Sequence, residues 1–509
     1  MTGAVERSRL LDSCASEPIH IIGHIQSHGL LFALSEPDFI VRHVSTNVAA
    51  LLSMSPDVVL GNSFEVVLGA RQFDTFRSRL RTDDLVPANP LRVQVGNRAL
   101  EMNCVAHRHD GVLIAEFEHV KGAHSLEPLT LAANIQALLS RLEKASDILD
   151  LSRVTAGELR RLSGFDRVMI YRFDADWNGE VIAAAVAPST VSYLGHRFPA
   201  SDIPAQARQL FMINPLRAIA DVDSAPVPIV PEIGPLTGRA LDLTNSFLRS
   251  ASRLHIEFLR NWGVQSSMTM SIIVEQRLWG MLALQHSAPR PVDCSVRSLC
   301  EMIGRNLSLQ VALRTSIAAQ QARRTSRELL EDCMAGIEAS QSLADAESFP
   351  RARFLELFDA DGLVSRIDGV VSSHGVTVAE QSLLPVIAKL RKSAFCNIAS
   401  SNMLGAIDQS AESYASKASG ALHIGLGEKS GDYLLFLRRE LVDTVTWAGN
   451  PDKAVSADVE GKLHPRTSFA AWQETVRGRS RPWTELELDN ARLLRVQLLH
   501  LRDAQRLRE

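Results

Sequence analysis

Residues 197–211, RFPASDIPAQARQLF, combine a clear helix start with an acidic residue that the helix alone does not explain. Pro204 suits the first turn of a helix, and the residues from Ala205 to Phe211 are good helix formers. Asp202 stands just ahead of this predicted helix, where a carboxylate can cap free backbone N–H groups. The rest of the chain has to decide whether Asp202 is only a cap or is directed at another group.

Strand patterns lie on both sides of this stretch. Residues 166–187 predict a strand, an Asn-Gly turn and a second strand, and residues 266–287 predict another hairpin. An amphipathic helical pattern over residues 129–164 precedes them. The Pro-rich run at residues 221–243 has no periodicity, but regular patterns resume after it. We therefore expect residues 121–310 to form one domain with an ordered loop excursion.

Two further domains are expected around this one. Residues 17–120 alternate short apolar runs with turns, which is typical of strands. Residues 305–335 contain neither Gly nor Pro, and a helix of that length spans about 45 Å, so it is expected to join two domains. Residues 336–509 mix strand and helix patterns, giving an α+β chain of three domains. The last helical pattern carries an apolar seam suited to a partner helix, made of Ala491, Leu494, Leu498 and Leu501.

Composition narrows the classes of protein. With 46% apolar residues, 22% charged residues and a net charge of −4, neither nucleic acid nor an anionic membrane is a favoured partner. No apolar run approaches the roughly 20 residues of a membrane span, and the N-terminus has no secretory pattern. The six cysteines are dispersed without a CxxC pair, which favours a reducing cytoplasm over a disulfide framework. We expect a soluble cytoplasmic protein.

Enzyme motifs are not found. The chain has no phosphate-binding GxxxxGK[ST] loop, no HExxH and no GxSxG. His20, His24 and His28 share one face of a helix in principle, but Gly23 between them and Pro18 before them argue against a continuous helix and against a metal site. We expect no catalytic residues and no metal.

Four separated motifs occur in a characteristic order. They are DSCASEPIHIIGHIQSHGLLFAL (12–34), residues 165–211, residues 248–286, and WAGNP with PRTSFAAWQE (447–474). Together they resemble the photosensory core of biliverdin-binding bacteriophytochromes. The resemblance implies an N-terminal extension (1–16) and PAS (17–120), GAF (121–310) and PHY (311–509) domains, each an antiparallel sheet flanked by helices. It also implies a figure-of-eight knot in which a GAF loop encircles the segment around Ile25, and a PHY tongue at about residues 440–482.

The resemblance implies a bound cofactor, biliverdin IXα. By itself Cys14 reads as an ordinary free thiol near a chain end. In the family this N-terminal cysteine forms a thioether with the bilin, whereas relatives with reduced bilins use a cysteine just before the residue that matches His255. That position is Leu254 here, so Cys14 is the implied anchor.

Further residues are assigned to the pigment by the same resemblance. Asp202 and His255 would hold the pyrrole rings, although a capping aspartate and a packed core histidine are the plain alternatives for isolated residues. Arg217 and Arg249 match the propionate-binding positions, where a guanidinium fork suits a carboxylate. Three hydroxyl residues could serve the other propionate: Ser252, Ser267 and Thr269. The wall of ring D would be formed by Met169, Tyr171, Phe198, Ile203, Phe211 and Phe258.

The C-terminal motif implies a switch. In the family the arginine of PRxSF pairs with the GAF aspartate, which here means Arg466 and Asp202. Ser468 belongs to the same motif, and Trp447 and Trp472 are expected to pack the tongue in one of its forms.

Several positions depart from the family pattern. Ile22 and Ser27 replace usual prolines, and Phe211 and Phe258 stand where many relatives have tyrosine. Gln285 stands where the family usually has a histidine that contacts ring D. Glutamine can donate a hydrogen bond but cannot become a cation, so the hypothesis is an altered photoproduct or an unusual reversion rate.

The implied function is a red/far-red photoreceptor that signals by bilin isomerisation and tongue refolding. A homodimer is expected, together with an output domain or response regulator downstream. Two alternatives remain: a histidine kinase or other signalling enzyme at full length, and a light-independent GAF-type sensor of small molecules.

Overall fold

The computed structural model describes residues 16–96, 99–120, 128–235, 237–339, 351–427, 431–453, 455–457 and 463–506. It divides into two compact units. The first unit comprises residues 1–314 with 446–472, and the second comprises residues 315–445 with 473–509. Each unit is described by itself.

The N-terminal part of the first unit contains an antiparallel sheet of seven described strands. Its phenylalanine core packs Phe32 against Phe64 and Phe117 with ring centroids 5.0 and 5.6 Å apart, and all three are fully buried. Short helices cover one side of the sheet: α2 (Val48–Leu52), α3 (Pro56–Val59), α4 (Glu65–Leu68), α5 (Ala70–Arg79) and η1 (Val86–Ala88). In spatial order the strands are β1 (His24–Ile25), β11 (Val227–Val230), β3 (Ile40–Ser45), β2 (Gly29–Ser35), β6 (Val112–His119), β5 (Leu100–His109) and β4 (Leu91–Val95).

The segment around Ile25 is held on two sides by later parts of the chain. β1 pairs antiparallel with β11, and Ile25 forms an isolated bridge with Arg249. The N–H of Gln26 donates to the carbonyl of Leu248 over 2.8 Å. Ile25 is fully buried. These contacts are those expected of the predicted threading, and His24 lies in a strand rather than in a histidine-bearing helix.

The second sheet of the first unit carries the 197–211 stretch. It confirms both predicted hairpins, β7–β8 and β12–β13, and the second turns at Glu275 and Gln276, which both have positive φ. One pairing near the edge of the sheet differs from the antiparallel expectation, since Trp447 pairs in parallel with Arg197. The described strands run in the order β10 (Leu216–Ile219), β12 (Ser266–Val274), β13 (Arg277–His286), β7 (Arg167–Phe173), β8 (Gly179–Val186), β9 (Arg197–Phe198), β19 (Asp443–Ala448) and β22 (Ala471–Val476).

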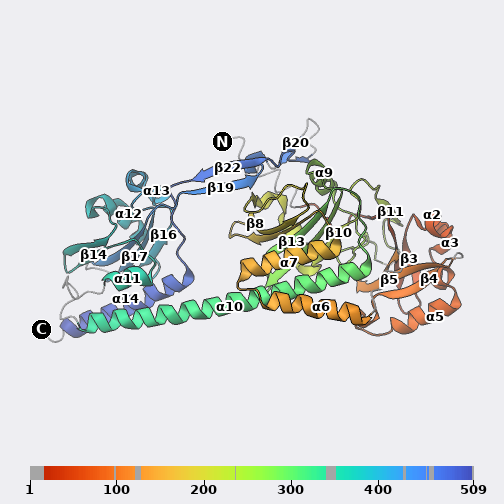
Figure 1. Cartoon of the computed structure of the whole chain (residues 1–509), viewed down its shortest axis with the longest axis horizontal. Coiled ribbons are helices and arrows are strands. Elements are labelled where there is room, and N and C mark those ends of the chain that lie inside the picture. Colours follow the sequence, from red (N-terminus) through yellow and green to blue (C-terminus); the bar gives the residue numbers. More distant parts are fainter. Residues whose placement is uncertain are drawn as a thin grey trace. The chain divides into compact units, whose positions relative to one another are not determined.

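Helices cover both faces of this sheet. On one face lie α6 (Pro128–Glu143), α7 (Ile148–Ser163) and the start of α10 (Cys294–Ala339), as Figure 1 shows. On the other face lie α8 (Ala205–Ile213), which confirms the predicted helix, and α9 (Arg253–Asn261). Asp147 caps α7 by accepting from the N–H of Asp150 over 2.8 Å, so the α6–α7 pattern breaks there. The face with α8 and α9 is the one that forms the cavity described below.

The second unit is built on a sheet of five described strands, all antiparallel. One face packs on α11 (Arg351–Leu357), α14 (Glu485–Arg506) and the end of α10, and the other on α12 (Glu380–Ser393), α13 (Leu404–Ile407) and η3 (Gln409–Tyr414). The strand order is β15 (Val370–Gly375), β14 (Gly362–Ile367), β18 (Tyr433–Arg438), β17 (Gly420–Gly425) and β16 (Ile398–Ser401).

Two helix predictions have different outcomes. The predicted long helix is confirmed as α10, a continuous helix of 46 residues that passes the division between the units after Arg314. The seam of α14 is not open to a partner helix of another chain, since Ala491, Leu494 and Leu498 are buried against α10 and the sheet of the same unit. The predicted apolar seam of α14 is present, but the helix that packs against it is α10 of the same chain.

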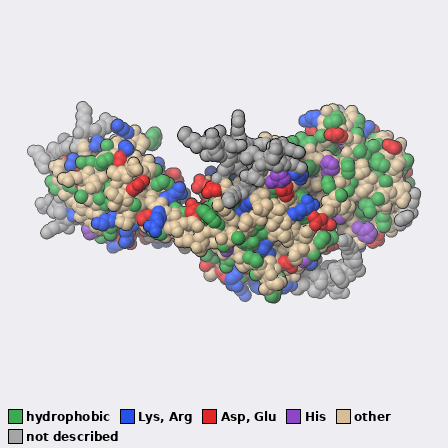
Figure 2. Space-filling view, turned by 90° about the horizontal axis from the view of Figure 1, so that it is seen from above, with side chains coloured by type: hydrophobic (Ala, Val, Ile, Leu, Met, Phe, Trp, Pro, Cys, Tyr) green, Lys and Arg blue, Asp and Glu red, His purple; other side chains and the backbone are tan. Residues whose placement is uncertain are grey.

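The first unit also contains short elements of the 440–482 segment. These are η4 (Pro451–Lys453), β20 (Val455–Ala457) and β21 (Leu463–Pro465). A further short helix of this unit, η2 (Ala200–Asp202), precedes α8. None of the described helices is long and apolar enough to cross a membrane. On the face seen in Figure 2, basic and acidic side chains are interspersed rather than gathered by sign.

Candidate functional site

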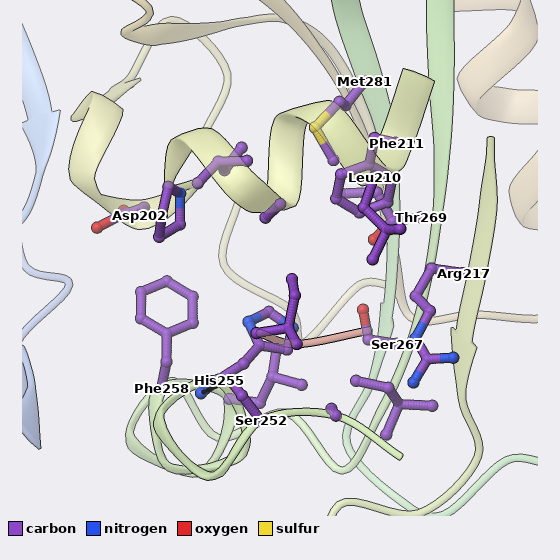
Figure 3. Close-up of a pocket in the computed structure, with 18 of the residues that line it drawn as sticks. Asp202, Leu210, Phe211, Arg217, Ser252, His255, Phe258, Ser267, Thr269 and Met281 are labelled. Atoms are coloured by element: carbon purple, nitrogen blue, oxygen red, sulfur yellow. Dashed lines mark hydrogen bonds between the residues drawn. The ribbon is translucent and has the colours of Figure 1, made fainter. Parts of the chain in front are cut away.

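A cavity opens between α8 and α9 in the first unit, over strands β12 and β13. It encloses about 1550 Å³ free of protein atoms, including a part open to solvent. In Figure 3, α8 borders one side, and Ser252, His255 and Phe258 face it from the other. Most of the predicted residues line this cavity: Tyr171, Phe198, Asp202, Ile203, Phe211, Arg217, Arg249, Ser252, His255, Phe258, Ser267, Thr269 and Gln285.

Asp202 answers the question raised by the 197–211 stretch. No side-chain hydrogen bond caps α8 or η2, so Asp202 is not the cap that its position allowed. Its carboxylate instead accepts from Arg466 over 2.5 Å, and Figure 3 shows the carboxylate directed away from the cavity. Both side chains are buried, with 6% and 2% of their surface exposed. Asp202 therefore contacts the predicted tongue arginine.

The surroundings of this ion pair are apolar. Burial raises the pKa of the Asp202 carboxyl to about 7, while Arg466 acts in the opposite direction. The Arg466 guanidinium lies 4.4 Å from the ring centroid of Phe469 and also donates to the carbonyl of Ala448. Removing two charges from water is costly, so the pair gains its stability from good geometry and these added contacts.

Arg217 and Arg249 are cations enclosed at the other end of the cavity. Arg217 donates to the carbonyls of Phe247 and Arg249, and Arg249 donates to that of Ile19 over 2.6 Å. Burial lowers the pKa of Arg217 well below its usual value and that of Arg249 to about 10. Among the described residues neither arginine forms an ion pair with a carboxylate. Two positive charges thus border the cavity without a carboxylate in ion-pair contact among the described residues.

His255 supplies a neutral imidazole. It lies on α9, whose N-cap Ser252 accepts from the N–H of His255 over 3.3 Å, so the Ser252 hydroxyl serves the helix. Desolvation by the surrounding protein, followed by the positive charge of Arg217, lowers the pKa of His255 to about 4, although the residue is exposed at the open cavity. Its ring stacks on Phe258 at 6.1 Å with an interplanar angle of 14°. At neutral pH one ring nitrogen therefore carries a proton and the other can accept a hydrogen bond.

Gln285 is one of the cavity residues that depart from the pattern implied by the resemblance. It lies on β13, 4% exposed, and pairs with Ser267 and Arg167 of the neighbouring strands. Its Oε1 accepts from the Nε and Nη2 of Arg167 over 2.8 and 2.5 Å. The amide is consequently held by a buried guanidinium.

Some predicted residues lie away from the cavity wall. Met169 is fully buried beneath Tyr171, whose hydroxyl is 3.7 Å from its sulfur. Ser468 is exposed, and Trp472 is half-buried, whereas Trp447 is 9% exposed on β19. Cys14 lies outside the described residues.

Other residues in and around the cavity were not predicted from the sequence. Trp262 and Met281 are ordinary core types, so no local pattern marks them. Glu116, from β6 of the first sheet, accepts from the N–H groups of Phe247 and Leu248 over 3.2 and 2.8 Å and so braces the segment that carries Arg249. Burial raises the pKa of Glu116 to about 8. The lining also includes Glu17, Ile19, Ser201, Pro204, Gln206, Ala207, Leu210, Asn214, Leu216, Ile219, Ala251, Leu254, Leu259, Ala283 and Pro465.

Three family models match the chain. They are a PAS fold over residues 14–120, a GAF domain over residues 147–314 and a phytochrome region over residues 322–506. Together they cover the two sheets of the first unit and the sheet of the second.

Known relatives agree with these models. The chain is 33% identical to a bacteriophytochrome of Xanthomonas campestris, covering 98% of this chain and 80% of the relative. It is 33% identical to cyanobacterial phytochrome B of a Nostoc species, covering 96% of this chain and 66% of that protein. This chain thus spans slightly less than two thirds of the cyanobacterial protein.

Solved structures have the same fold over nearly the whole chain. The crystal structure of a bacteriophytochrome from R. palustris superposes with a TM-score of 0.85 at 34% identity, covering 96% of this chain and 98% of that one. The photosensory core module of the Stigmatella aurantiaca phytochrome gives 0.81 at 34% identity, covering 96% and 97%. The chain therefore belongs to the phytochrome family and contains the PAS, GAF and PHY domains of its photosensory core.

Proposed function

We propose that this chain senses red and far-red light through biliverdin IXα bound in the cavity between α8 and α9. The observation that carries the proposal is the pair of buried arginines, Arg217 and Arg249, for which no ion-paired carboxylate is found among the described residues. Two propionates on one ligand would supply the missing charge. A guanidinium suits a carboxylate because its planar N–H groups match the two oxygens.

The remaining cavity residues fit an elongated, largely apolar ligand. The space is long enough for Asp202 and Arg217 to stand at its opposite ends in Figure 3. Ser267 and Thr269 border it near Arg217, where their hydroxyls can donate to a carboxylate. Tyr171, Phe198 and Phe258 provide aromatic walls. These features support a linear tetrapyrrole with charged groups at one side and rings along the rest.

The polar groups near α9 fit the ring nitrogens of such a ligand. When bound, biliverdin supplies visible-light absorption and a methine bridge that light can isomerise. The neutral imidazole of His255 can accept a hydrogen bond from a pyrrole N–H, directly or through a water. The backbone carbonyl of Asp202, whose carboxylate is engaged by Arg466, is the proposed second acceptor for the ring nitrogens. These two residues orient the ligand.

Covalent attachment through Cys14 is compatible with the chain's reach. Glu17 and Ile19 line the cavity, and two residues, Ala15 and Ser16, separate Cys14 from Glu17. An extended chain covers at most about 3.5 Å per residue, so three steps of chain reach about 10 Å from Glu17. This distance supports the thioether anchor that the family resemblance implied.

The output of the receptor is proposed to pass through the tongue. A change in the ligand near Asp202 would free its carboxylate from Arg466, and the tongue could then repack. The tongue limits of about 440–482, the domain limits inferred from the sequence and a homodimer are part of this proposal. So is an output domain or response regulator, whether a histidine kinase or another signalling protein.

One experiment tests the proposed function. The apoprotein is mixed with biliverdin, and the adduct is followed by absorbance before and after denaturation and then during red and far-red illumination. We expect colour that survives denaturation and changes under red light. Cys14→Ser should lose the colour on denaturation yet still bind the pigment. A chain that forms no coloured complex would instead be a light-independent sensor of another small molecule.

A further inference from the structure

The amide of Gln285 has a defined orientation. Two N–H groups of Arg167 donate to the same atom of the Gln285 amide. Because arginine has only donors, that atom is the carbonyl oxygen Oε1 and not the nitrogen. The Nε2 group is therefore the one left at the cavity wall, where Gln285 contributes to the lining. No acceptor for Nε2 is found among the described residues. A hydrogen-bond donor is held ready for a ligand oxygen.

Arg167 is itself fixed by two aromatic rings. Its guanidinium carbon lies 4.9 Å from the ring centroids of both Tyr193 and Trp262. Trp262 donates its indole N–H to the hydroxyl of Tyr193 over 3.0 Å, so the two aromatic side chains that contact Arg167 are also bonded to each other. Arg167 also donates to the carbonyl of Val191 over 3.2 Å. A guanidinium held by two rings cannot turn away from Gln285 without losing these contacts.

The same tryptophan reaches the tongue. Trp262 stacks on Phe469 with ring centroids 4.9 Å apart and an interplanar angle of 7°. Phe469 is 8% exposed, and its ring also carries the guanidinium of Arg466, at 4.4 Å. Two chains of contacts therefore connect the cavity to the tongue. One runs from Asp202 to Arg466, and the other from Gln285 through Arg167 and Trp262 to Phe469.

We propose that Arg167 is a positioning residue that aims the Gln285 amide at a carbonyl oxygen of the bound bilin and couples this donor to the tongue through Trp262 and Phe469. The first part of this inference, the contact between Gln285 and the ligand (the ligand end), rests on the proposed function. The second part, the coupling from Arg167 to the tongue (the tongue end), rests on contacts within the protein. Because Phe469 and Arg466 share one contact, release of the tongue loosens both chains of contacts together.

The chemistry requires an arginine at this place. A guanidinium fork can donate two hydrogen bonds to one amide oxygen while its carbon lies 4.9 Å from the centroids of two aromatic rings. A lysine keeps the charge and one donor, but its ammonium cannot stack in the same manner. An uncharged side chain leaves the Gln285 amide free to turn, so its oxygen can face the cavity and oppose a ligand carbonyl.

The test measures the two ends separately in the full chain. Noncovalent affinity for biliverdin is titrated by absorbance in a Cys14→Ser background, and amide hydrogen exchange of the peptide 463–472 is measured without ligand. Arg167→Met should weaken biliverdin binding about tenfold, the scale of a charge-assisted hydrogen bond, and accelerate exchange in the tongue peptide. Arg167→Lys should show smaller changes of both kinds.

A double variant with Gln285 distinguishes a positioning role of Arg167 from a general loss of structure. Gln285→Leu should weaken binding about as much as Arg167→Met, and the double variant should be no weaker, because the two residues act as one unit. Trp262→Leu should accelerate exchange in the tongue peptide. The inference would be overturned if the double variant lost affinity by the product of the two single losses. Normal affinity and normal exchange in Arg167→Met would overturn it as well.

Matched controls lie on the same elements. Arg172→Met changes another arginine of β7, which pairs at the surface with Glu180, and Trp177→Leu changes a tryptophan in the β7–β8 turn. Both should leave affinity and tongue exchange unchanged, and thermal unfolding checks that each variant is folded. If the unsubstituted chain binds no biliverdin, the proposed function fails, and so does the proposed contact between Gln285 and the ligand. The hydrogen-exchange comparison still accepts or rejects the coupling from Arg167 to the tongue.

Discussion

Arg466 donates a hydrogen bond to the carboxylate of Asp202 across 264 residues of sequence, at 2.5 Å and with both side chains almost fully buried. This contact ties the 197–211 stretch to the PRTSF motif within one compact unit. An ion pair in such surroundings gives little net stability relative to apolar residues, but losing one partner leaves the other charge uncompensated. The contact is therefore suited to a switch.

Asp202→Ala should separate a structural role of this pair from a switching role. The variant leaves Arg466 buried without its carboxylate, which costs about 3–5 kcal/mol of unfolding free energy. Biliverdin should still bind, while photoconversion fails. Urea unfolding and red/far-red difference spectra measure the two effects.

An exposed pair offers the control. Asp223→Ala removes a carboxylate that meets Arg260 at 2.7 Å on the surface, and it should change neither stability nor photoconversion measurably. Normal photoconversion of the Asp202→Ala variant would contradict the switch.

The Asp202 carboxyl should also give stability a pH dependence. Its pKa in the folded chain is raised to about 7 by burial, from an ordinary value of 3.8. Between these values the folded state binds more protons than the unfolded state, so this group makes the unfolding free energy fall as pH rises, and the fall ends above pH 7. Asp202→Asn removes the titration.

The measurement is a difference between two proteins. The unfolding free energy of the parent minus that of Asp202→Asn should decrease from pH 5 to pH 7 and become constant near pH 8. A difference that stays constant from pH 5 to pH 8 would mean that Arg466 holds the folded-state pKa at or below its ordinary value.

Arg217→Met tests the charge complementarity of the cavity. Without this guanidinium, one propionate loses its fork, and biliverdin should bind about tenfold more weakly in the Cys14→Ser background. Biliverdin dimethyl ester lacks the negative charges, so its affinity should be the same in parent and variant. Arg239→Met, whose guanidinium pairs with Asp110 at the surface, should bind both ligands normally. Equal losses for biliverdin and its ester would assign Arg217 to folding alone.

Gln285→His restores the residue usual in the family. The imidazole would face Arg167, which disfavours its charged form, so a neutral ring should accept from Arg167 and donate to the ligand. We expect a changed photoproduct spectrum or a changed rate of thermal reversion. Dark-adapted spectra and reversion kinetics, with Gln285→Leu as the variant that has no donor, provide the measurement. Spectra and rates identical to those of the parent would refute the hypothesis that Gln285 sets an unusual photocycle.

Local elements were predictable because their causes are local. Pro204 and the residues after it are sufficient to start α8, and the turns of both hairpins lie within a few residues of the strands they join. The seam of α14 shows the limit of such reasoning, since spacing predicts an apolar face but not which helix covers it.

The four motifs were sufficient to predict the three-domain fold and thirteen of the thirty residues that line the cavity, because each motif carries several residue types at once. By itself the 197–211 stretch determined a helix preceded by an acidic residue. Only the tertiary structure decided that Asp202 meets Arg466 rather than α8, and that Gln285, Arg167, Trp262 and Phe469 follow one another in space. The physical reason is that propensity and periodicity act over a few residues, whereas burial and charge compensation depend on which distant side chains share the same enclosed volume.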